Sequence, residues 1–122
     1  MSVIAIVGAS NDHAKYGNKA VRAYLKRGWT VHPVNSRETA IEGLPVYPSI
    51  REVPGPVDRA ALYVPPSVGE RLLDDLAAAR PKEIYLNPGT ESTTLLAGLG
   101  VRGLNFVLGC AILDIGERPA DY

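Results

Sequence analysis

The stretch Val3-Ile4-Ala5-Ile6-Val7-Gly8-Ala9-Ser10 decides the fold of this 122-residue chain. Five consecutive apolar residues that end at a glycine are typical of a strand buried on both faces of a parallel sheet. Small and polar residues fill the next segment as far as Gly17, and a helical pattern follows. A strand, a small-residue turn and a helix in this order predict a helix that crosses back to a parallel strand.

The helical pattern behind this loop has one apolar side and one basic side. The apolar positions are Ala20, Val21, Tyr24 and Leu25, and the basic ones are Lys19, Arg22 and Lys26. This spacing predicts a helix that packs its apolar side on the sheet and stops at Gly28. We expect the basic side chains, together with Arg27, to form a solvated face.

Four further segments have the composition of core strands, namely residues 29–34, 59–64, 83–86 and 104–108. Pro33 has no N–H to donate to a neighbouring strand, so we expect the first of these strands to end near His32. Ser67 and Glu70 have the spacing of a capping box and predict a helix that ends before Pro81.

The remaining segments are assigned from their turn formers and helix caps. A short helix is expected over 92–96, and residues 35–56 are expected to be mostly loop, with a short helix near 49–52. The tail 116–122 is expected to fray.

Strands that alternate with helices predict a three-layer, doubly wound α/β fold. We expect a Rossmann-like parallel sheet of about five strands in a single domain over residues 1–122. Such sheets bind ligands outside the carboxyl ends of their strands. The loops that meet this criterion are Gly8–Gly17, Asn35–Arg37, Val64–Ser67, Asn87–Gly89 and Leu108–Cys110.

The overall composition excludes several classes of protein. Thirteen basic residues balance thirteen acidic ones, so net charge gives no reason to expect nucleic acid or a membrane surface as a partner. No apolar run approaches the roughly 20 residues of a membrane helix. The single cysteine, Cys110, excludes an internal disulfide and a multi-cysteine zinc site. We therefore expect a cytoplasmic protein.

The first predicted ligand loop has the features of a phosphate site. Gly8–Gly17 combines small residues and a lysine, Lys15, with the start of a helix, whose N–H groups attract anions. The loop matches neither the G-x-G-x-x-G dinucleotide fingerprint nor a Walker loop. A tight turn with no ligand explains it equally well.

The second loop, Val34-Asn35-Ser36-Arg37, has no carboxylate for an unmodified ribose. Arg37 suits a phosphorylated ribose instead, such as that of NADP or coenzyme A. Residues 1–37 carry six basic side chains and one acidic, whereas residues 38–122 carry seven basic and twelve acidic. This asymmetry is consistent with an anion-binding end.

Candidate catalytic residues are few, and we predict neither a catalytic residue nor a metal site. The two histidines, His13 and His32, have no carboxylate partner at metal-ligand spacing. Cys110 is more simply explained as a small buried side chain than as a functional thiol. Ser10 and Ser67 lack the G-x-S-x-G context of a nucleophile.

Taken in order, the segments 7–10, 25–35, 41–50, 56–58 and 85–89, with Cys110, resemble the CoA-binding domain family. These proteins are stand-alone relatives of the N-terminal domain of the succinyl-CoA synthetase alpha subunit. The most specific part is Gly28-Trp29-Thr30-Val31-His32-Pro33-Val34-Asn35 followed by Gly43-Leu44-Pro45-Val46-Tyr47. The chain departs from the family at Ser36, where proline is usual.

The resemblance implies a non-catalytic binding domain for coenzyme A or an acyl-CoA, without ligase activity, because the phosphohistidine of the synthetase belongs to a second domain. It implies phosphate contacts from the first loop and its helix, an adenosine near the second loop, an apolar wall from the third loop and a pantetheine arm along the fourth. The predicted site residues are Gly8, Ala9, Ser10, Asn11, Lys15, Tyr16, Gly17, Asn35, Ser36, Arg37, Val64, Pro65, Pro66, Asn87, Pro88 and Gly89.

Two other classes of function remain open at this point. Arg37 and the Rossmann-like order also fit an NADP- or NAD-binding protein or small reductase, although the missing G-x-G-x-x-G counts against it. The chain also fits a ligand-sensing regulatory subunit whose binding cleft is completed by a partner or in a homodimer.

Overall fold

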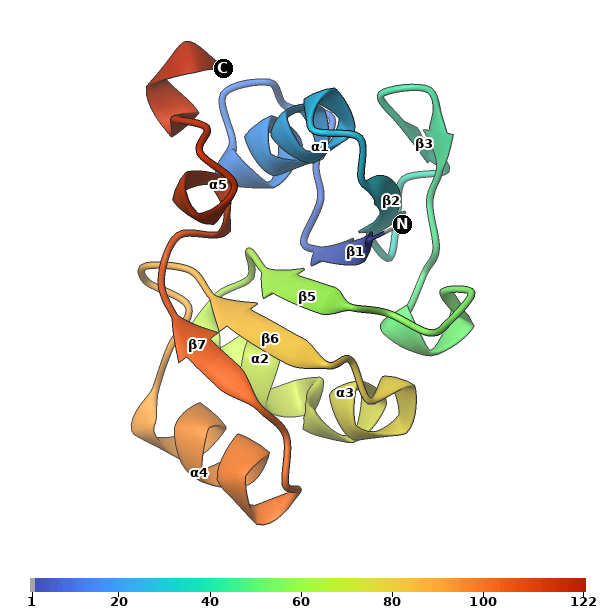
Figure 1. Ribbon diagram of the computed structural model, residues 1–122. Coiled ribbons are helices and arrows are strands. Elements are labelled where there is room, and N and C mark those ends of the chain that lie inside the picture. The colour runs from blue at the N-terminus through green and yellow to red at the C-terminus, as the bar shows by residue number, and fades with distance from the viewer. Residues whose placement is uncertain (1) are drawn as a thin grey trace.

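The computed structural model describes residues 2–122 and has a parallel sheet of five strands at its centre (Figure 1). In spatial order the strands are β2 (Thr30–Val34), β1 (Val3–Val7), β5 (Arg59–Leu62), β6 (Glu83–Leu86) and β7 (Phe106–Leu108). All four neighbouring pairs are parallel, which confirms the predicted alternation of strands and helices.

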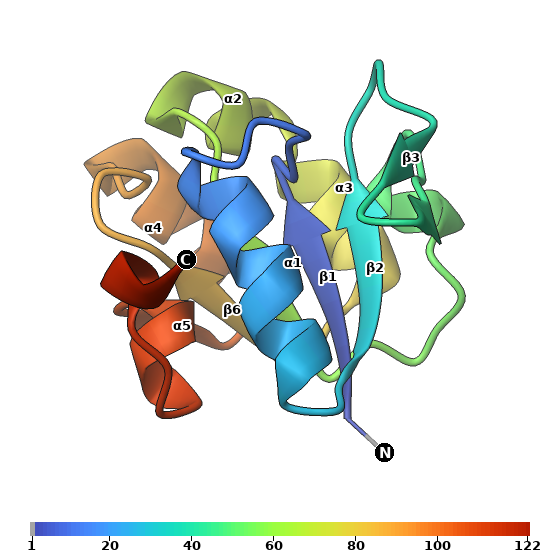
Figure 2. The same cartoon turned by 90° about the horizontal axis from the view of Figure 1, so that it is seen from above.

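Helices cover both faces of the sheet, as Figures 1 and 2 show. α1 (Tyr16–Lys26) and α5 (Ala111–Asp114) lie over one face, and α2 (Pro66–Arg71), α3 (Leu73–Ala79) and α4 (Thr93–Val101) lie over the other. Side chains alternate along β1, so that Ile4 and Ile6 join the core beneath α1 while Ala5 and Val7 join the core beneath α3. The three-layer, doubly wound α/β fold is confirmed.

The strand order reverses between β1 and β5. The chain leaves β1 through α1 and reaches β2 on one side, whereas it leaves β5 through α2 and α3 and reaches β6 on the other side. The loops that follow β1 and β5 therefore diverge at the carboxyl edge of the sheet. This switch point is where doubly wound sheets bind ligands.

β2 runs through Pro33 to Val34, so the prediction that it ends near His32 is wrong. β2 is an edge strand, and the Pro33 carbonyl accepts a hydrogen bond from the Tyr47 N–H (3.0 Å) on the side away from β1. Because the N and C=O of one strand residue point to the same side, the missing N–H of Pro33 removes no bond to β1.

Residues 35–56 contain a hairpin that the sequence did not predict. β3 (Ala40–Ile41) and β4 (Leu44–Pro45) pair antiparallel around Glu42 and Gly43, whose φ angles are 49° and 75°. Tight hairpin turns need positive φ at both central residues, and they are usually signalled by Asn-Gly or Asp-Gly rather than Glu-Gly. The short helix predicted near 49–52 is present as the 3₁₀ helix η1 (Ile50–Glu52).

The predicted capping box of Ser67 and Glu70 is wrong. α2 begins at Pro66, one residue before Ser67, and no side chain caps it. The Glu70 carboxylate instead accepts a hydrogen bond from the Ser92 hydroxyl (2.7 Å), and Ser92 caps α4. The pattern of Ser67 and Glu70 was local, whereas the partner of Glu70 lies 22 residues away.

α4 is longer than the helix predicted over 92–96, because it continues through Gly98 to Val101. Glycine is a poor helix former, but the side chain of Leu73 from α3 occupies the space that a Cβ at Gly98 would need. Close packing between α3 and α4 therefore accounts for the glycine within the helix.

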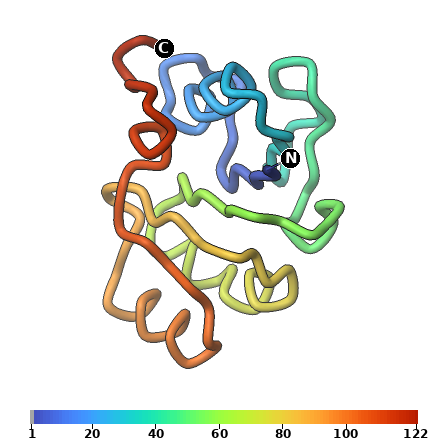
Figure 3. Tube along the Cα trace, viewed as in Figure 1, coloured from blue at the N-terminus to red at the C-terminus, as the bar shows by residue number. Residues whose placement is uncertain are grey.

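The tail 116–122 packs along α1 and does not fray, contrary to the prediction (Figure 3). Glu117 is buried and accepts hydrogen bonds from the Tyr122 hydroxyl (2.6 Å), Arg27 (2.6 Å) and Lys26 (3.4 Å). These contacts, the one from Tyr122 foremost, lower the pKa of Glu117 to about 2. The basic side of α1 is thus a binding face for the tail and not simply a solvated one.

Among residues 2–122 the longest helix, α1, has 11 residues, and no helix is both long and apolar enough to cross a bilayer.

Candidate ligand-binding site at the carboxyl edge of the sheet

Two cavities open at the carboxyl edge of the sheet beside the switch point. The large cavity has a volume of about 750 Å³ and the small cavity about 210 Å³. The large cavity is lined by Gly8, Ala14, Lys15, Tyr16, Gly17, Tyr63, Val64, Pro65, Asn87, Pro88, Gly89, Thr90, Cys110, Leu113 and Pro119. The small cavity is lined by Val7, Gly8, Val34, Asn35, Ser36, Pro48, Ser49, Ile50, Val64, Val68, Leu72, Asp75 and Leu76.

Gly8 and Val64 line both cavities, so the two cavities adjoin at the switch point. The small cavity lies over the ends of β1 and β2, and the large cavity extends past β5 and β6 to Cys110, which follows β7. A ligand that filled both would lie across the carboxyl ends of all five strands.

The turn after β1 is tightly built, and its first N–H groups are already occupied. The N–H groups of Gly8 and Ala9 both donate to the Val34 carbonyl (3.1 and 3.3 Å), and Ala9 is fully buried. Gly8 has a φ of 91°, and a Cβ there would lie 2.5 Å from the Tyr63 carbonyl oxygen. The resemblance implied that Gly8 and Ala9 contact a phosphate. Their two N–H groups instead hold β1 to β2 and are not free to bind one.

Ser10 and Asn11 fix the loop and line neither cavity. The Ser10 hydroxyl accepts a hydrogen bond from the Asp12 N–H (3.0 Å). The Asn11 amide donates to the Glu38 carboxylate (2.8 Å) and to the Ala40 carbonyl (3.0 Å). Both side chains therefore attach the loop to itself and to the β3–β4 hairpin.

The start of α1 is the part of this loop that faces the large cavity. Lys15, Tyr16 and Gly17 line it, and no side chain caps the helix. The first N–H groups of a helix have no partner within it, and they carry the positive end of the helix dipole. Among the residues that line the large cavity, Lys15 alone carries a charge. This end of the cavity is therefore electropositive.

In the second loop, Asn35 and Ser36 line the small cavity and Arg37 does not. The Asn35 amide donates to the Ala9 carbonyl (2.9 Å) and accepts from the N–H groups of Arg37 and Glu38 (2.7 and 3.0 Å). The Asn35 side chain is thus occupied in shaping the loop. Arg37 is exposed, and within residues 2–122 its guanidinium has no carboxylate in ion-pair range.

The loop after β5 begins earlier than predicted, because β5 ends at Leu62 and not at Val64. Val64 and Pro65 line the cavities as an apolar wall, whereas Pro66 is the first residue of α2 and lines neither. The earlier end of the strand places Tyr63 in the loop.

Asn87, Pro88 and Gly89, after β6, all line the large cavity. The buried Asn87 amide donates to the Leu62 carbonyl (2.9 Å) and accepts from the Ala111 N–H (2.9 Å). This side chain therefore joins β5, β6 and α5, and it sets the floor of the cavity.

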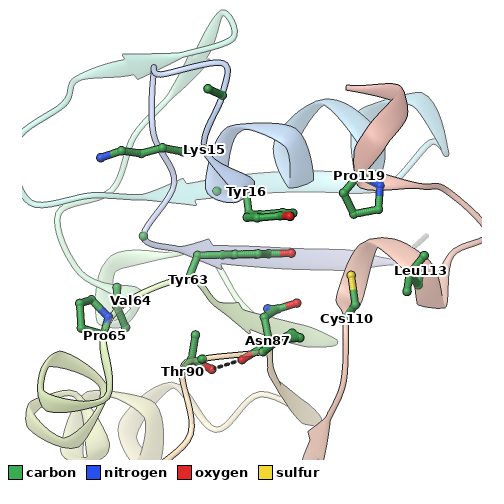
Figure 4. A pocket seen from close by; sticks show the side chains of 15 residues that line it. Lys15, Tyr16, Tyr63, Val64, Pro65, Asn87, Thr90, Cys110, Leu113 and Pro119 are labelled. Atoms are coloured by element: carbon green, nitrogen blue, oxygen red, sulfur yellow. Dashed lines mark hydrogen bonds between the residues drawn. The ribbon is translucent and has the colours of Figure 1, made fainter.

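Four lining residues of the large cavity lie outside the predicted ligand loops, namely Tyr63, Thr90, Leu113 and Pro119 (Figure 4), and the predicted site residues also omit Ala14. Tyr63 was assigned to a strand, and Leu113 and Pro119 reach the cavity only because α5 and the tail pack beside α1. Cys110, for which a buried structural role was favoured, also lines the cavity. The predicted loop after β5 began at Val64, one residue after Tyr63. The predicted loop after β6 ended at Gly89, one residue before Thr90.

The histidines lie outside both cavities. His13 has its Nε2 2.9 Å from a Glu42 carboxylate oxygen, and the ring of His32 packs edge-on against Tyr47. Burial lowers the pKa of His32. Within residues 2–122 no three metal-ligating side chains come together.

Comparison with known proteins identifies relatives of this chain. The sequence model of the family described as "CoA binding domain" matches residues 2–115. The chain is 43% identical over 63 residues to the ADP-forming acetate–CoA ligase II subunit alpha of Pyrococcus furiosus. It is 33% identical over 73 residues to the ADP-forming acetate–CoA ligase I of Archaeoglobus fulgidus.

These two matches cover 51% and 60% of this chain, but they span only 14% and 11% of the two ligases. The names of both relatives refer to CoA and not to a nicotinamide nucleotide, so the NADP alternative receives no support from them.

Two solved structures are similar to this chain in both fold and sequence. A conserved hypothetical protein from Pyrococcus furiosus superposes with a TM-score of 0.86 at 36% identity, covering 93% of this chain and 99% of its own. The dinucleotide-forming acetyl-coenzyme A synthetase 1 of Ca. Korarchaeum cryptofilum, in complex with phosphate and ADP, superposes with a TM-score of 0.78 at 30% identity. That match covers 88% of this chain and 25% of the synthetase.

Proposed function

This chain belongs to the CoA binding domain family, and we propose that it binds coenzyme A or an acyl-CoA along the carboxyl edge of its sheet without transforming it. The observation that carries the proposal is the pair of cavities that adjoin at the switch point. Coenzyme A is an elongated molecule with a nucleotide at one end and a flexible thiol-bearing arm at the other. The family match covers every residue that lines these cavities except Pro119.

The small cavity would receive the adenosine. Asn35, Ser36 and Ser49 give it a polar rim, and Ile50 and Leu76 give it apolar walls. Its one charged lining residue, Asp75, is already paired with Arg51. Arg37 follows Ser36 directly, and its unpaired guanidinium is suited to a phosphate on the ribose.

The diphosphate would lie where the two cavities adjoin. Two kinds of electropositive group lie there, the ammonium group of Lys15 and the free N–H groups at the start of α1. The N–H groups of Gly8 and Ala9 are occupied. An anion at a helix N-terminus is stabilised by both the N–H groups and the helix dipole.

The large cavity would receive the pantetheine arm. Val64, Pro65, Pro88 and Leu113 supply apolar walls, and the cavity ends near Cys110. An arm of amide and methylene groups fits a cavity that is mostly apolar with few polar groups.

Part of the lining is consistent with binding without catalysis. Neither cavity contains a histidine, and the only carboxylate, that of Asp75, is neutralised by Arg51. The other titratable lining groups are Lys15, Tyr16, Tyr63 and Cys110, and burial raises the pKa of Tyr63 far above the physiological range, so that it does not act as a base. We do not propose the ligase activity of the longer relatives for this chain.

Isothermal titration calorimetry with coenzyme A, acetyl-CoA, NADP and NAD tests the proposal. We expect heat of binding for the two CoA compounds, and no displacement of coenzyme A by either nicotinamide nucleotide. At a ligand concentration of 100 times Kd, binding should raise the free energy of unfolding by about 2.7 kcal/mol in a thermal-shift assay. The absence of binding by both CoA compounds at millimolar concentration would refute the proposal.

A ligand-sensing role and a homodimer remain predictions that accompany this proposal. Size-exclusion chromatography with and without coenzyme A tests both, because a sensor that assembles on binding changes its elution volume only when the ligand is present.

A further inference from the structure

The Tyr63 hydroxyl is a buried polar group that lacks a partner. It is the one buried side-chain nitrogen or oxygen within residues 2–122 that makes no hydrogen bond. Burying a hydroxyl without a hydrogen bond is unfavourable, and native proteins satisfy nearly all such groups. A ligand that accepts a hydrogen bond at this position would remove the deficit.

Tyr63 forms part of the wall of the large cavity, and its hydroxyl oxygen is buried in that wall. Tyr63 directly follows β5 and lines the cavity, and its ring packs against the core beneath α1. In Figure 4 its hydroxyl end points toward the side where Cys110 and Leu113 lie, while the Lys15 ammonium points the opposite way. The hydroxyl therefore points away from the Lys15 ammonium and toward the Cys110 side of the cavity.

Neighbouring polar groups at this end are already satisfied. The Tyr24 hydroxyl donates to the Ala111 carbonyl (2.6 Å), and the Asn87 amide bonds to the main chain on both sides. The Thr90 hydroxyl donates to the Asn87 carbonyl (2.7 Å). Within residues 2–122 the Tyr63 hydroxyl is the buried side-chain donor left without a partner, so an acceptor placed beside it would be recognised.

The chemistry of that acceptor follows from the surroundings. Burial raises the pKa of Tyr63 far above the physiological range, so its hydroxyl stays protonated and acts as a donor. Leu113, Pro119 and Cys110 are uncharged, and the Lys19 ammonium beside them is bonded to the Pro119 carbonyl (3.2 Å). A carbonyl oxygen is an acceptor that suits a protonated phenol donor.

We propose that the large cavity binds the acyl end of an acyl-CoA, and that the Tyr63 hydroxyl donates a hydrogen bond to the thioester carbonyl. This inference rests on the proposed function, because the direction of the ligand is set by the phosphates at the start of α1. The thioester lies at the opposite end of coenzyme A from the nucleotide, and the Tyr63 hydroxyl points away from the Lys15 ammonium (Figure 4).

The test uses calorimetry to measure the affinities of the unmodified protein and of Tyr63→Phe for two ligands. Acetyl-CoA is compared with S-ethyl-CoA, which has the same size but carries a methylene in place of the thioester carbonyl. We expect the unmodified protein to bind acetyl-CoA about tenfold more tightly, and Tyr63→Phe to lose this preference. Tyr47→Phe, which removes a hydroxyl outside both cavities, is the matched control and should keep it.

The stability of the ligand-free variant separates binding from structure. Because Tyr63→Phe removes an unpaired hydroxyl, its unfolding midpoint without ligand should stay the same or rise. A lower midpoint would mean that the hydroxyl supports the fold, and it would overturn the inference. A preference for acetyl-CoA that survives in Tyr63→Phe would overturn it as well, as would an equal loss of affinity for both ligands. Failure of every CoA compound to bind would instead refute the proposed function, so the two failures are distinguishable.

Discussion

Arg37 distinguishes between the two kinds of phosphate that coenzyme A carries. Its guanidinium is exposed beside the small cavity, while the diphosphate is assigned to the start of α1. Arg37→Ala should therefore weaken binding of coenzyme A by about 1.5–3 kcal/mol, the range of a charge-assisted hydrogen bond. Dephospho-CoA, which lacks the ribose phosphate, should bind the variant and the unmodified protein equally in calorimetry.

Arg71→Ala is the control for this measurement, because Arg71 is also exposed and lines neither cavity. Its affinity for both ligands should stay unchanged. Equal losses for both ligands in Arg37→Ala would assign Arg37 to the diphosphate, and no loss for either would leave the phosphate to Lys15 and the helix.

Gly17 sets how closely α1 approaches the turn after β1. A Cβ at this position would collide with the Gly8 carbonyl oxygen, which is backbone and cannot move aside. Gly17→Ala should lower the free energy of unfolding by about 1–3 kcal/mol, as overpacking does, and it should weaken coenzyme A binding by displacing the helix start.

Chemical denaturation measures the free energy of unfolding of Gly17→Ala, and Gly100→Ala is the control. Gly100 lies in α4 with open space around it, so alanine there should raise stability by up to about 1 kcal/mol. If Gly17→Ala is as stable as the unmodified protein, the close approach of α1 does not constrain this site.

At the scale of elements, the tail is held to α1 by one buried carboxylate. The pKa of Glu117 is lowered from its ordinary value near 4.5 to about 2. A depressed carboxylate pKa stabilises the fold above the unfolded value and loses this contribution as pH falls through the folded one. The unmodified protein should therefore exceed Glu117→Gln in unfolding midpoint at pH 7, and this difference should shrink between pH 4.5 and 2.

Thermal unfolding of both proteins across this pH range is the measurement. Other carboxylates, such as Asp58 and Asp114, also have lowered pKa values, so the difference between the two proteins is the relevant quantity. A difference that stays constant down to pH 2 would show that the Glu117 charge does not hold the tail.

Elements whose cause is local were predictable from the sequence, and those with a distant cause were not. β1 and the loop after it were predicted because a continuous apolar run followed by glycine is sufficient. Pro33 lies within β2 because β2 is an edge strand, and this is a property of the strand order. The tail depends on the pair Arg27 and Glu117, which lie 90 residues apart.

The candidate site likewise has features that were predictable from the sequence and features that were not. The loop criterion located Lys15, Asn35, Val64 and Asn87 at the cavities because the ends of parallel strands meet at one edge. It did not reveal that Asn35 and Asn87 bond to the main chain. Nor did it identify Tyr63, since the strand before it ends two residues earlier than its apolar run.

At the scale of the whole molecule, the uneven charge of the chain has two explanations. Four of the six basic residues in 1–37 have partners within the fold, as Lys19, Lys26 and Arg27 contact the tail and Arg22 contacts Asn18. The remaining two, Lys15 and Arg37, lie at or beside the cavities. Lys26 and Arg27 share the Glu117 carboxylate, whereas Lys19 and Arg22 bond to uncharged groups. The two basic residues left over are those that the proposed ligand uses.

The most direct test of the central claim is a two-dimensional amide NMR titration of the protein with coenzyme A. A ligand that lies across the strand ends should shift the amide signals of the loops that line both cavities, including Gly8, Lys15, Ser36, Val64 and Gly89. Signals from the opposite edge of the sheet, such as those of Asp58 and Lys82, should stay in place. Unchanged spectra at millimolar coenzyme A, or shifts confined to residues outside the two cavities, would contradict the account.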